Sequence, residues 1–216
     1  MTKVCPMNSA VDEKEQVLAA VARWQYLPIS RIREHESKCC QEAREWLTCM
    51  DSSFAASGGR TIAPYWIRDV YEWGPCRWPL TWCEVINMET VDCGVLAAIA
   101  VLLLKARGVI CFPVQLVMQY SPQDIEQWRG RWQSERIAYD WTLGNMVYHE
   151  ACAVTSDHNS VRIWDPTDCL WLDDSSVAGY SSVRAVRLVP EKDDGRPDVM
   201  LWGKHELANG LWVQLV

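Results

Sequence analysis

The chain has 216 residues, of which 49% are apolar and 23% are charged, a composition that is typical of a globular protein and excludes a disordered or fibrous chain. Its formal net charge of −7 and the lack of a long Lys/Arg run argue against nucleic acid as a partner. We therefore expect one domain over residues 1–216, long enough to bury a sizeable core.

The sequence shows no targeting or membrane signal. Residues 1–12 carry a single Lys and lack the apolar segment of a secretory signal. The longest apolar run, 95–104, is about half as long as a membrane-spanning helix, and Lys105 and Arg107 follow it. We expect a cytoplasmic protein without a membrane partner, and the sequence leaves its oligomeric state open.

The ten cysteines are scattered along the chain, without a CxxC pair or the spacing of a structural zinc site. A chain with an ample apolar core does not need a disulfide framework, so we expect most cysteines to be reduced, buried and inert. We also expect no metal and no cofactor. The thirteen tryptophans can fill the core or line a large apolar cleft.

Hydrophobic periodicity divides the chain into a helical first part and a strand-rich second part, which predicts an α+β fold with an antiparallel sheet. Gly-Pro and Trp-Pro pairs at 74–75 and 78–79 keep the region between two opening helices and a central helix largely irregular. In chain order, we expect helices at 11–26 and 32–50, a loop at 51–60, a short helix at 66–71, the central helix at 91–107, a strand at 109–120, a helix at 123–135, strands at 147–155, 160–164 and 183–189, a turn at 157–160, and a packing segment at 200–216.

The segment 91–107 gives the strongest helix signal. Thr90 or Asp92 can cap its start, Gly108 can end it, and apolar residues fill nearly every face. Such a helix belongs at the centre of a fold, packed against a sheet. Cys93 therefore falls in the first turn of the central helix.

Cys93 is the candidate nucleophile. A thiol is reactive as a thiolate, which both a helix N-terminus and a neighbouring imidazolium favour. Gly94 leaves room for a substrate carbonyl and for a backbone N–H that faces the oxyanion. His149 is the best candidate base, since the other histidines fall in an exposed helix, a turn and the tail. Asp165 ends the next expected strand, so a hairpin would place it beside His149, where it can orient the ring.

The order of these three residues resembles the transglutaminase-like superfamily of papain-like cysteine enzymes, with a Cys at a helix start, a His on one strand and an Asp on the next. The most specific part is 161–167, Val-Arg-Ile-Trp-Asp-Pro-Thr, which is similar to that family's apolar strand ending in Asp-Pro. The resemblance spans 87–173. It implies a catalytic core at 87–190, with the central helix packed on an antiparallel sheet, additional N-terminal helices at 1–50, and a thioester acyl-enzyme.

The chain also departs from that pattern. Residues 150–152, Glu-Ala-Cys, follow His149 where the family commonly has a small residue and then Trp, so the resemblance implies a mechanism without a particular substrate. Asp165 precedes Pro166, and an Asp before Pro commonly starts a turn, which is its alternative role; Asp168 and Asp173 are weaker candidates for orienting the ring.

The backbone N–H of Cys93 is the first candidate donor to the oxyanion, and a side chain from 82–87 can add a second. Asn87 can donate through its amide, although an Asn there can equally cap a loop. Trp82 can donate through its indole N–H, although packing is the alternative role. Cys93 itself has the alternative of an inert buried thiol.

Together, Cys93, His149 and Asp165 predict acyl transfer through a thioester. We expect a small-molecule, peptide or carrier-bound acyl substrate, and the Trp-rich approach to Cys93 favours transfer from a small or carrier-bound donor, with amide-bond formation at an acceptor amine. Hydrolysis by a cysteine peptidase, amidase or protein deamidase is the close alternative. Two further alternatives are a non-catalytic binding protein on a degenerate scaffold of the same family, and a thiol sensor in which Cys93 pairs with Cys83 or Cys111.

Overall fold

The computed structural model of the chain describes residues 9–25, 27, 32–33, 37–56, 62–76, 80–134, 141–155, 161–172, 183–188 and 212–214. The helices within these ranges are α1 (Ser9–Trp24), α2 (Lys38–Ala56), α3 (Ile67–Val70), α4 (Trp82–Val85), α5 (Cys93–Ala106) and α6 (Pro122–Ser134). The strands are β1 (Glu72–Trp73), β2 (Thr90–Val91), β3 (Cys111–Gln119), β4 (Thr142–Leu143), β5 (Met146–Thr155), β6 (Val161–Asp165), β7 (Leu170–Trp171), β8 (Val183–Leu188) and β9 (Trp212–Gln214).

An antiparallel sheet organises the second half of the chain. Its strands run in the order β7-β6-β5-β3-β8-β9, and β4 pairs with the start of β5. The long strands β3 and β5 pair along the whole length of β3. β1 and β2 form a separate parallel pair shortly before α5. The chain therefore has a mixed α+β fold with an antiparallel sheet, and this part of the sequence prediction is confirmed.

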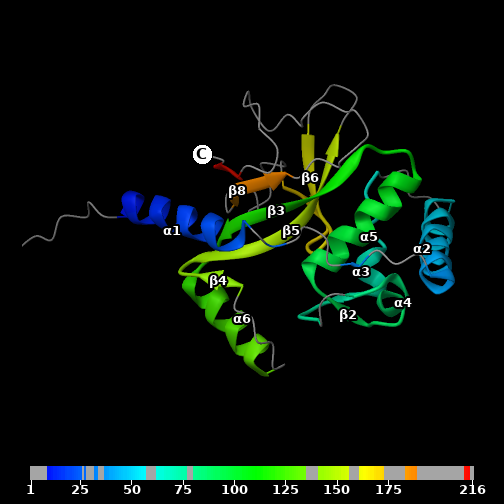
Figure 1. The fold of residues 1–216 in the computed structure, drawn as a ribbon, viewed down its shortest axis with the longest axis horizontal. Helices are drawn as coiled ribbons and strands as arrows, with labels where there is room; N and C mark the ends of the chain where they lie inside the picture. Colours follow the sequence, from blue (N-terminus) through cyan, green and yellow to red (C-terminus); the bar gives the residue numbers. More distant parts are fainter. Residues whose placement is uncertain are drawn as a thin grey trace, which may run out of the picture.

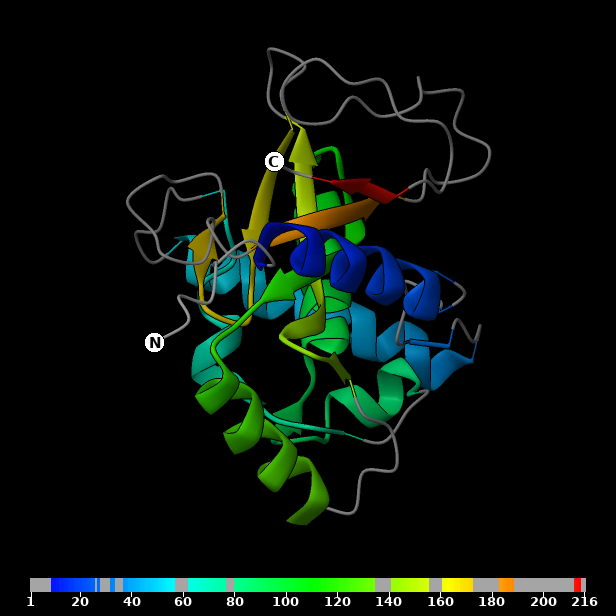
Figure 2. The same ribbon diagram turned by 90° about the vertical axis from the view of Figure 1, so that its left-hand side faces the viewer.

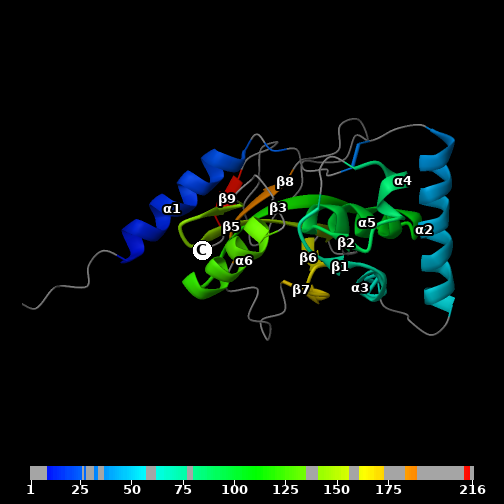
Figure 3. The ribbon, with the colours of Figure 1, turned by 90° about the horizontal axis from the view of Figure 1, so that it is seen from below.

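The larger helices lie toward opposite ends of this sheet. α5 packs against β5 and β3, and α2 and α3 pack against α5 in turn (Figure 1). α1, the dark blue helix in Figure 2, crosses the sheet and contacts β3, β5 and β8. Seen from below, α2, α3, α4 and α5 gather at one end and α1 and α6 at the other (Figure 3). The long strands β3 and β5 thus connect a helical end with the end that α1 covers.

Both ends of α5 are fixed by their local sequence. The side chain of Asp92 accepts a hydrogen bond from the backbone N–H of Val95 at 2.9 Å, which caps the start. Gly108 has a φ of 77°, a left-handed conformation that favours glycine. The N–H groups of Gly108 and Val109 donate to carbonyls of the last turn, in the Schellman pattern. The predicted cap and stop signals of the central helix are confirmed.

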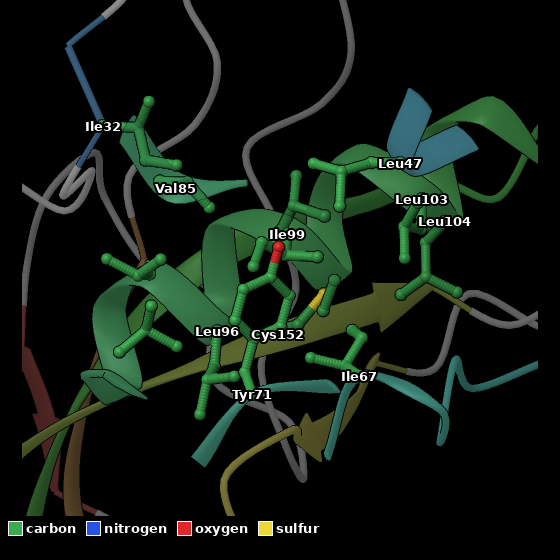
Figure 4. Packing of buried hydrophobic residues seen from close by; sticks show 14 of the residues in the cluster. Ile32, Leu47, Ile67, Tyr71, Val85, Leu96, Ile99, Leu103, Leu104 and Cys152 are labelled. Atoms are coloured by element: carbon green, nitrogen blue, oxygen red, sulfur yellow. The ribbon is translucent and has the colours of Figure 1, made fainter. Parts of the chain in front are cut away.

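The core closes around α5, whose Leu96, Ile99 and Leu103 are fully buried. Figure 4 shows side chains from several other segments around them: Leu47, Ile67, Tyr71 and Cys152. Burying one such Leu or Ile contributes about 1.5–3 kcal/mol relative to leaving it exposed. A helix that is packed in this way along its length cannot easily slide, so the position of its first residue is well defined.

α2 begins and ends later than the prediction of a helix at 32–50 followed by a loop. The serines that suggested a loop lie inside the helix: Ser52 and Ser53 donate to carbonyls one turn earlier, each at 3.0 Å. Asp51 is buried and accepts hydrogen bonds from Arg107. Polar side chains with such partners fit in a helix. The predicted loop at 51–60 was therefore wrong for residues 51–56, which belong to α2.

The other predicted helices and strands are present with bounds shifted by a few residues. The turn at 157–160 and most of the segment 200–216 lie outside the described residues, although β9 within that segment pairs with β8. The sequence did not predict α4, β1, β2, β4 and β7, because each has only two to four residues, too few for a periodic pattern. Throughout the described ranges, no helix combines the length and apolar character needed to cross a bilayer.

Candidate active site

Cys93 is the first residue of α5, directly after the Asp92 cap. The first N–H groups of a helix have no partner within the helix, and the helix dipole favours negative charge at this end. Cys93 is partly buried. The backbone N–H of Asp92 donates to Sγ of Cys76 at 3.4 Å, which ties the turn before Cys93 to the segment after β1. The thiol therefore lies at a fixed helix start.

His149 and Asp165 come from the neighbouring strands β5 and β6, which pair antiparallel. Nε2 of His149 lies 2.8 Å from Oδ2 of Asp165, within hydrogen-bond distance. The other carboxylate oxygen of Asp165 accepts the backbone N–H of Thr167, also at 2.8 Å. Asp165 is 1% exposed and His149 is 8% exposed. The structure thus brings the predicted pair together and fixes the orientation of the carboxylate.

The surroundings of His149 place Cys93 beside its ring. Burial lowers the pKa of His149, but Asp165 and Cys93 oppose it, each through its charge and a hydrogen bond. The balance raises the pKa of His149 well above the usual 6.5. Because Nε2 faces Asp165, Nδ1 is the ring nitrogen left for the thiol. The imidazole thus meets the carboxylate of Asp165 directly and lies within electrostatic reach of the Cys93 thiol, and its protonated form is favoured.

Tyr120, just after β3, lies within electrostatic reach of these three groups. Burial raises the pKa of Tyr120 to about 12, so its phenol stays protonated at neutral pH. The charges of Cys93, His149, Asp165 and Asp168 also act on it. Burial and then the charge of Asp165 raise the pKa of Asp168. Asp168 is thus a neighbour of the site, while Asp165 holds the ring; Asp173 lies outside the described residues.

Tyr120 also begins a row of aromatic rings. Trp128 on α6 meets it edge-on, with 4.5 Å between ring centroids. Trp73 on β1 follows, with its centroid 6.5 Å from that of Trp128. These three side chains, here called the aromatic row, are partly buried and come from three different parts of the fold. They provide apolar surface that starts at the edge of the candidate site.

The two candidate oxyanion side chains differ in their surroundings. Asn87 is exposed, and its side-chain amide donates to the carbonyl of Cys83 at 2.7 Å, at the end of α4. Trp82 is 4% exposed, and its indole N–H meets no acceptor among the described residues. Asn87 is engaged as a local helix cap, so of the two donors only that of Trp82 is unused among the described residues.

The expectation that most cysteines are reduced and buried is borne out in its first part only: most of the described cysteines are free thiols, but most are not buried. Cys39 and Cys83 form a disulfide. Seven described cysteines are free thiols, and only three of them are buried. Burial, and then a hydrogen bond with Cys111, raise the pKa of Cys152 well above its usual value. Cys83 and Cys111, the partners considered for Cys93 in a thiol sensor, thus already have other sulfur neighbours.

In the part of the chain that the structure describes, no group of three or more His, Cys, Asp and Glu side chains is arranged to hold a metal ion. Comparisons of the chain with family models, with curated proteins and with solved structures find no match. The site rests on its own geometry.

The sequence did not single out Tyr120, Trp128 or Cys76. A signal existed for Tyr120, since it ends the predicted strand after the Cys93 helix, and that strand could be expected to pair with the strand of His149. Trp128 and Cys76 reach the site through contacts between distant elements, which no local pattern records.

Proposed function

We propose that this chain is a cysteine acyltransferase, which forms a thioester on Cys93 and passes the acyl group to an amine. The observation that supports this most is the position of His149 between the carboxylate of Asp165 and the thiol of Cys93. An imidazole in that position can take the proton of the thiol, and the carboxylate stabilises the imidazolium that forms.

The likeness to transglutaminase-like, papain-like enzymes belongs to this proposal. A buried helix that starts with the Cys, a strand with the His and a neighbouring strand that ends in the Asp form the arrangement expected of such a core. We place this core at 87–190, with α1 and α2 as additional N-terminal helices.

In the first half-reaction, Sγ of Cys93 bonds to the carbonyl carbon of the acyl donor and the bond to the leaving group breaks. The oxygen takes negative charge opposite the backbone N–H of Cys93, with the Trp82 indole as candidate second donor. His149 gives its proton to the leaving group. In the second half-reaction, an amine attacks the thioester, and His149 takes the proton from the amine nitrogen and returns it to the departing sulfur.

The aromatic row favours transfer of an apolar acyl group over hydrolysis. Tyr120 lies within electrostatic reach of the reacting groups, and the rings of Trp128 and Trp73 continue its apolar surface away from them. Apolar side chains around a thioester lower the local supply of water, so an acceptor amine that binds there competes better for the acyl group.

The test is an acylation experiment with p-nitrophenyl acetate and p-nitrophenyl hexanoate, read by nitrophenol release and by intact mass. We expect one acyl group per chain on Cys93 in a rapid first phase, followed by turnover when an arylamine or alkylamine is added. Cys93→Ala abolishes acylation, and His149→Gln slows it by about 10²–10⁴-fold. Cys49→Ser is the matched control, since Cys49 is an exposed free thiol on α2.

Each other outcome of the acylation experiment would support a different alternative to the proposed transferase. If the acyl group on Cys93 is lost by hydrolysis and is not transferred to the added amine, the protein is a hydrolase in place of a transferase. Equal acylation in wild type and His149→Gln would show that the imidazole does not activate the thiol. No preference for Cys93 over the exposed Cys49 would refute the enzyme and leave a binding protein on the same scaffold.

A further inference from the structure

Three sulfur atoms meet where α2 starts and α4 lies, in a group that does not include Cys93, His149 or Asp165. Cys39 and Cys83 are disulfide-bonded, although they are 44 residues apart in the chain. Sγ of Cys40, the next residue of α2, lies 3.4 Å from Sγ of Cys83. A free thiol thus faces a sulfur that is already bonded to its own sequence neighbour. These three residues are here called the thiol cluster.

The surroundings of Cys40 favour its thiolate form. A hydrogen bond from the Ser37 side chain lowers the pKa of Cys40, burial raises it, and backbone N–H groups of Cys83 and Trp82 lower it again. The charge of Arg44 acts in the same direction, and the balance is a lowered pKa. A thiolate is the species that attacks a disulfide, so the donors around Cys40 prepare it for exchange.

The three cysteines differ in their access to solvent. Cys40 is 1% exposed, whereas Cys39 is exposed and Cys83 is partly buried. Exchange between Cys40 and Cys83 would therefore occur inside the protein, and the sulfur it releases would lie at the surface. A disulfide bond measures about 2.05 Å, so a new bond between Cys40 and Cys83 requires their sulfurs to close a gap that is now 3.4 Å.

We propose that the thiol cluster is a thiol–disulfide exchange site, which exposes Cys39 as a modification site for low-molecular-weight disulfides. The Cys40 thiolate, having lost its proton to water, bonds to Sγ of Cys83 while the Cys39–Cys83 bond breaks. Cys39 leaves as a surface thiolate. It then attacks an external disulfide, forms a mixed disulfide, and releases one small thiolate, which takes a proton from water. The exchange does not use the sulfur of Cys93, so its chemical steps are separate from those of the proposed acyl transfer.

The experiment exposes the full chain, purified without reductant, to oxidised glutathione near neutral pH. The reaction is stopped with acid and the protein is digested with trypsin without reduction. Cleavage after Lys38 and Arg44 leaves Cys39 and Cys40 in one peptide, so fragmentation between them is needed to assign the adduct. Cys49, an exposed free thiol further along α2, reports reaction with the reagent in every sample.

In wild type, we expect glutathione on Cys39 and a new disulfide between Cys40 and Cys83. In Cys40→Ala, the Cys39–Cys83 bond stays intact and the adduct on Cys39 falls by about 10-fold or more, while Cys49 is modified as before. An equal adduct on Cys39 in both proteins, or none in wild type while Cys49 reacts, would overturn the proposal.

Cys39→Ser tests the same contact without truncating a buried residue. With Cys39 absent, we expect oxidised glutathione to produce a Cys40–Cys83 disulfide, because the two sulfurs already face one another. A free Cys40 at the end of that reaction would refute the exchange. Failure of either test leaves the acylation of Cys93 untouched, since the two experiments read different cysteines.

Discussion

Removing the carboxylate of Asp51 should destabilise the protein strongly, because this side chain joins three segments near the end of α5. Asp51 accepts from Nε of Arg107 at 2.6 Å and from a second guanidinium nitrogen at 2.5 Å. It also accepts the indole N–H of Trp66 at 2.7 Å. Arg107 in turn donates to the carbonyl of Ile62 at 2.8 Å. The carboxylate therefore links α2, the C-terminal cap of α5 and the segment 62–66.

The size of the expected loss in the free energy of unfolding follows from how deeply the ion pair is buried. Breaking a buried ion pair by removing one partner typically costs about 3–5 kcal/mol, because the other charge is left uncompensated. The side chain of Asp51 is 5% exposed and that of Arg107 is 22% exposed, so water can reach part of the guanidinium and the lower end applies. We expect Asp51→Ala to lower the free energy of unfolding by about 3 kcal/mol. Asp51→Asn, which keeps an acceptor for the Trp66 indole, should cost about 1.5 kcal/mol.

Urea unfolding measures the loss in the free energy of unfolding directly. With a slope of about 2 kcal/mol per M, a loss of about 3 kcal/mol moves the midpoint by about 1.5 M. A double-mutant cycle with Arg107→Met isolates the interaction energy between Asp51 and Arg107. The control is Ser52→Ala, an exposed position next to Asp51 on α2, which should change the free energy of unfolding by no more than about 0.5 kcal/mol. A loss below about 1 kcal/mol for Asp51→Ala would refute the reasoning from burial.

Four further predictions address the candidate site and the core. Asp165→Asn, which keeps the shape but removes the charge beside the ring, should slow acyl turnover by about 10²–10⁴-fold, measured with p-nitrophenyl acetate. Because the folded-state pKa of His149 is raised, its stabilising effect is fully present below pH 6.5 and is lost as pH rises through the raised pKa. The difference in unfolding free energy between wild type and His149→Gln should shrink over that window, and a difference that grows with pH would contradict the direction of the shift. Trp128→Ala should raise KM for the hexanoate ester by about 10-fold and change KM for the acetate ester little, since it shortens the aromatic row. Ile99→Ala should cost about 2–5 kcal/mol in urea unfolding, because the side chain is fully buried.

The sequence predicted best where local chemistry and tertiary structure agree. The central helix has an Asp cap, a nearly continuous apolar body and a Gly stop, and the structure uses all three. The pairing of His149 with Asp165 was predictable because a hairpin brings neighbouring strands into contact, whatever surrounds them. In both cases the residues that decide the outcome lie close together in the chain.

The predictions that were wrong or missing concern contacts between residues far apart in the chain. Ser52 and Ser53 suggest a loop by composition, yet the buried Asp51 contacts bind that stretch into α2. The disulfide between Cys39 and Cys83 joins positions 44 residues apart, and cysteine spacing carries no information on such a contact. Each miss depends on a partner that is remote in sequence.

The candidate site combines two structural units with different supports. Cys93 belongs to the helical end, where α5 packs against α2 and α3 as well as against β5 and β3. His149 and Asp165 belong to the sheet, where strand pairing holds them regardless of those helices. The thiol cluster joins α2 to α4 and so acts on the helical end alone. A change in its disulfide should therefore alter the reactivity of Cys93 while leaving the hydrogen bond between His149 and Asp165 in place. The imidazole signals of His149, assigned by their loss in His149→Gln, would report that separation directly in an NMR titration of the two disulfide forms.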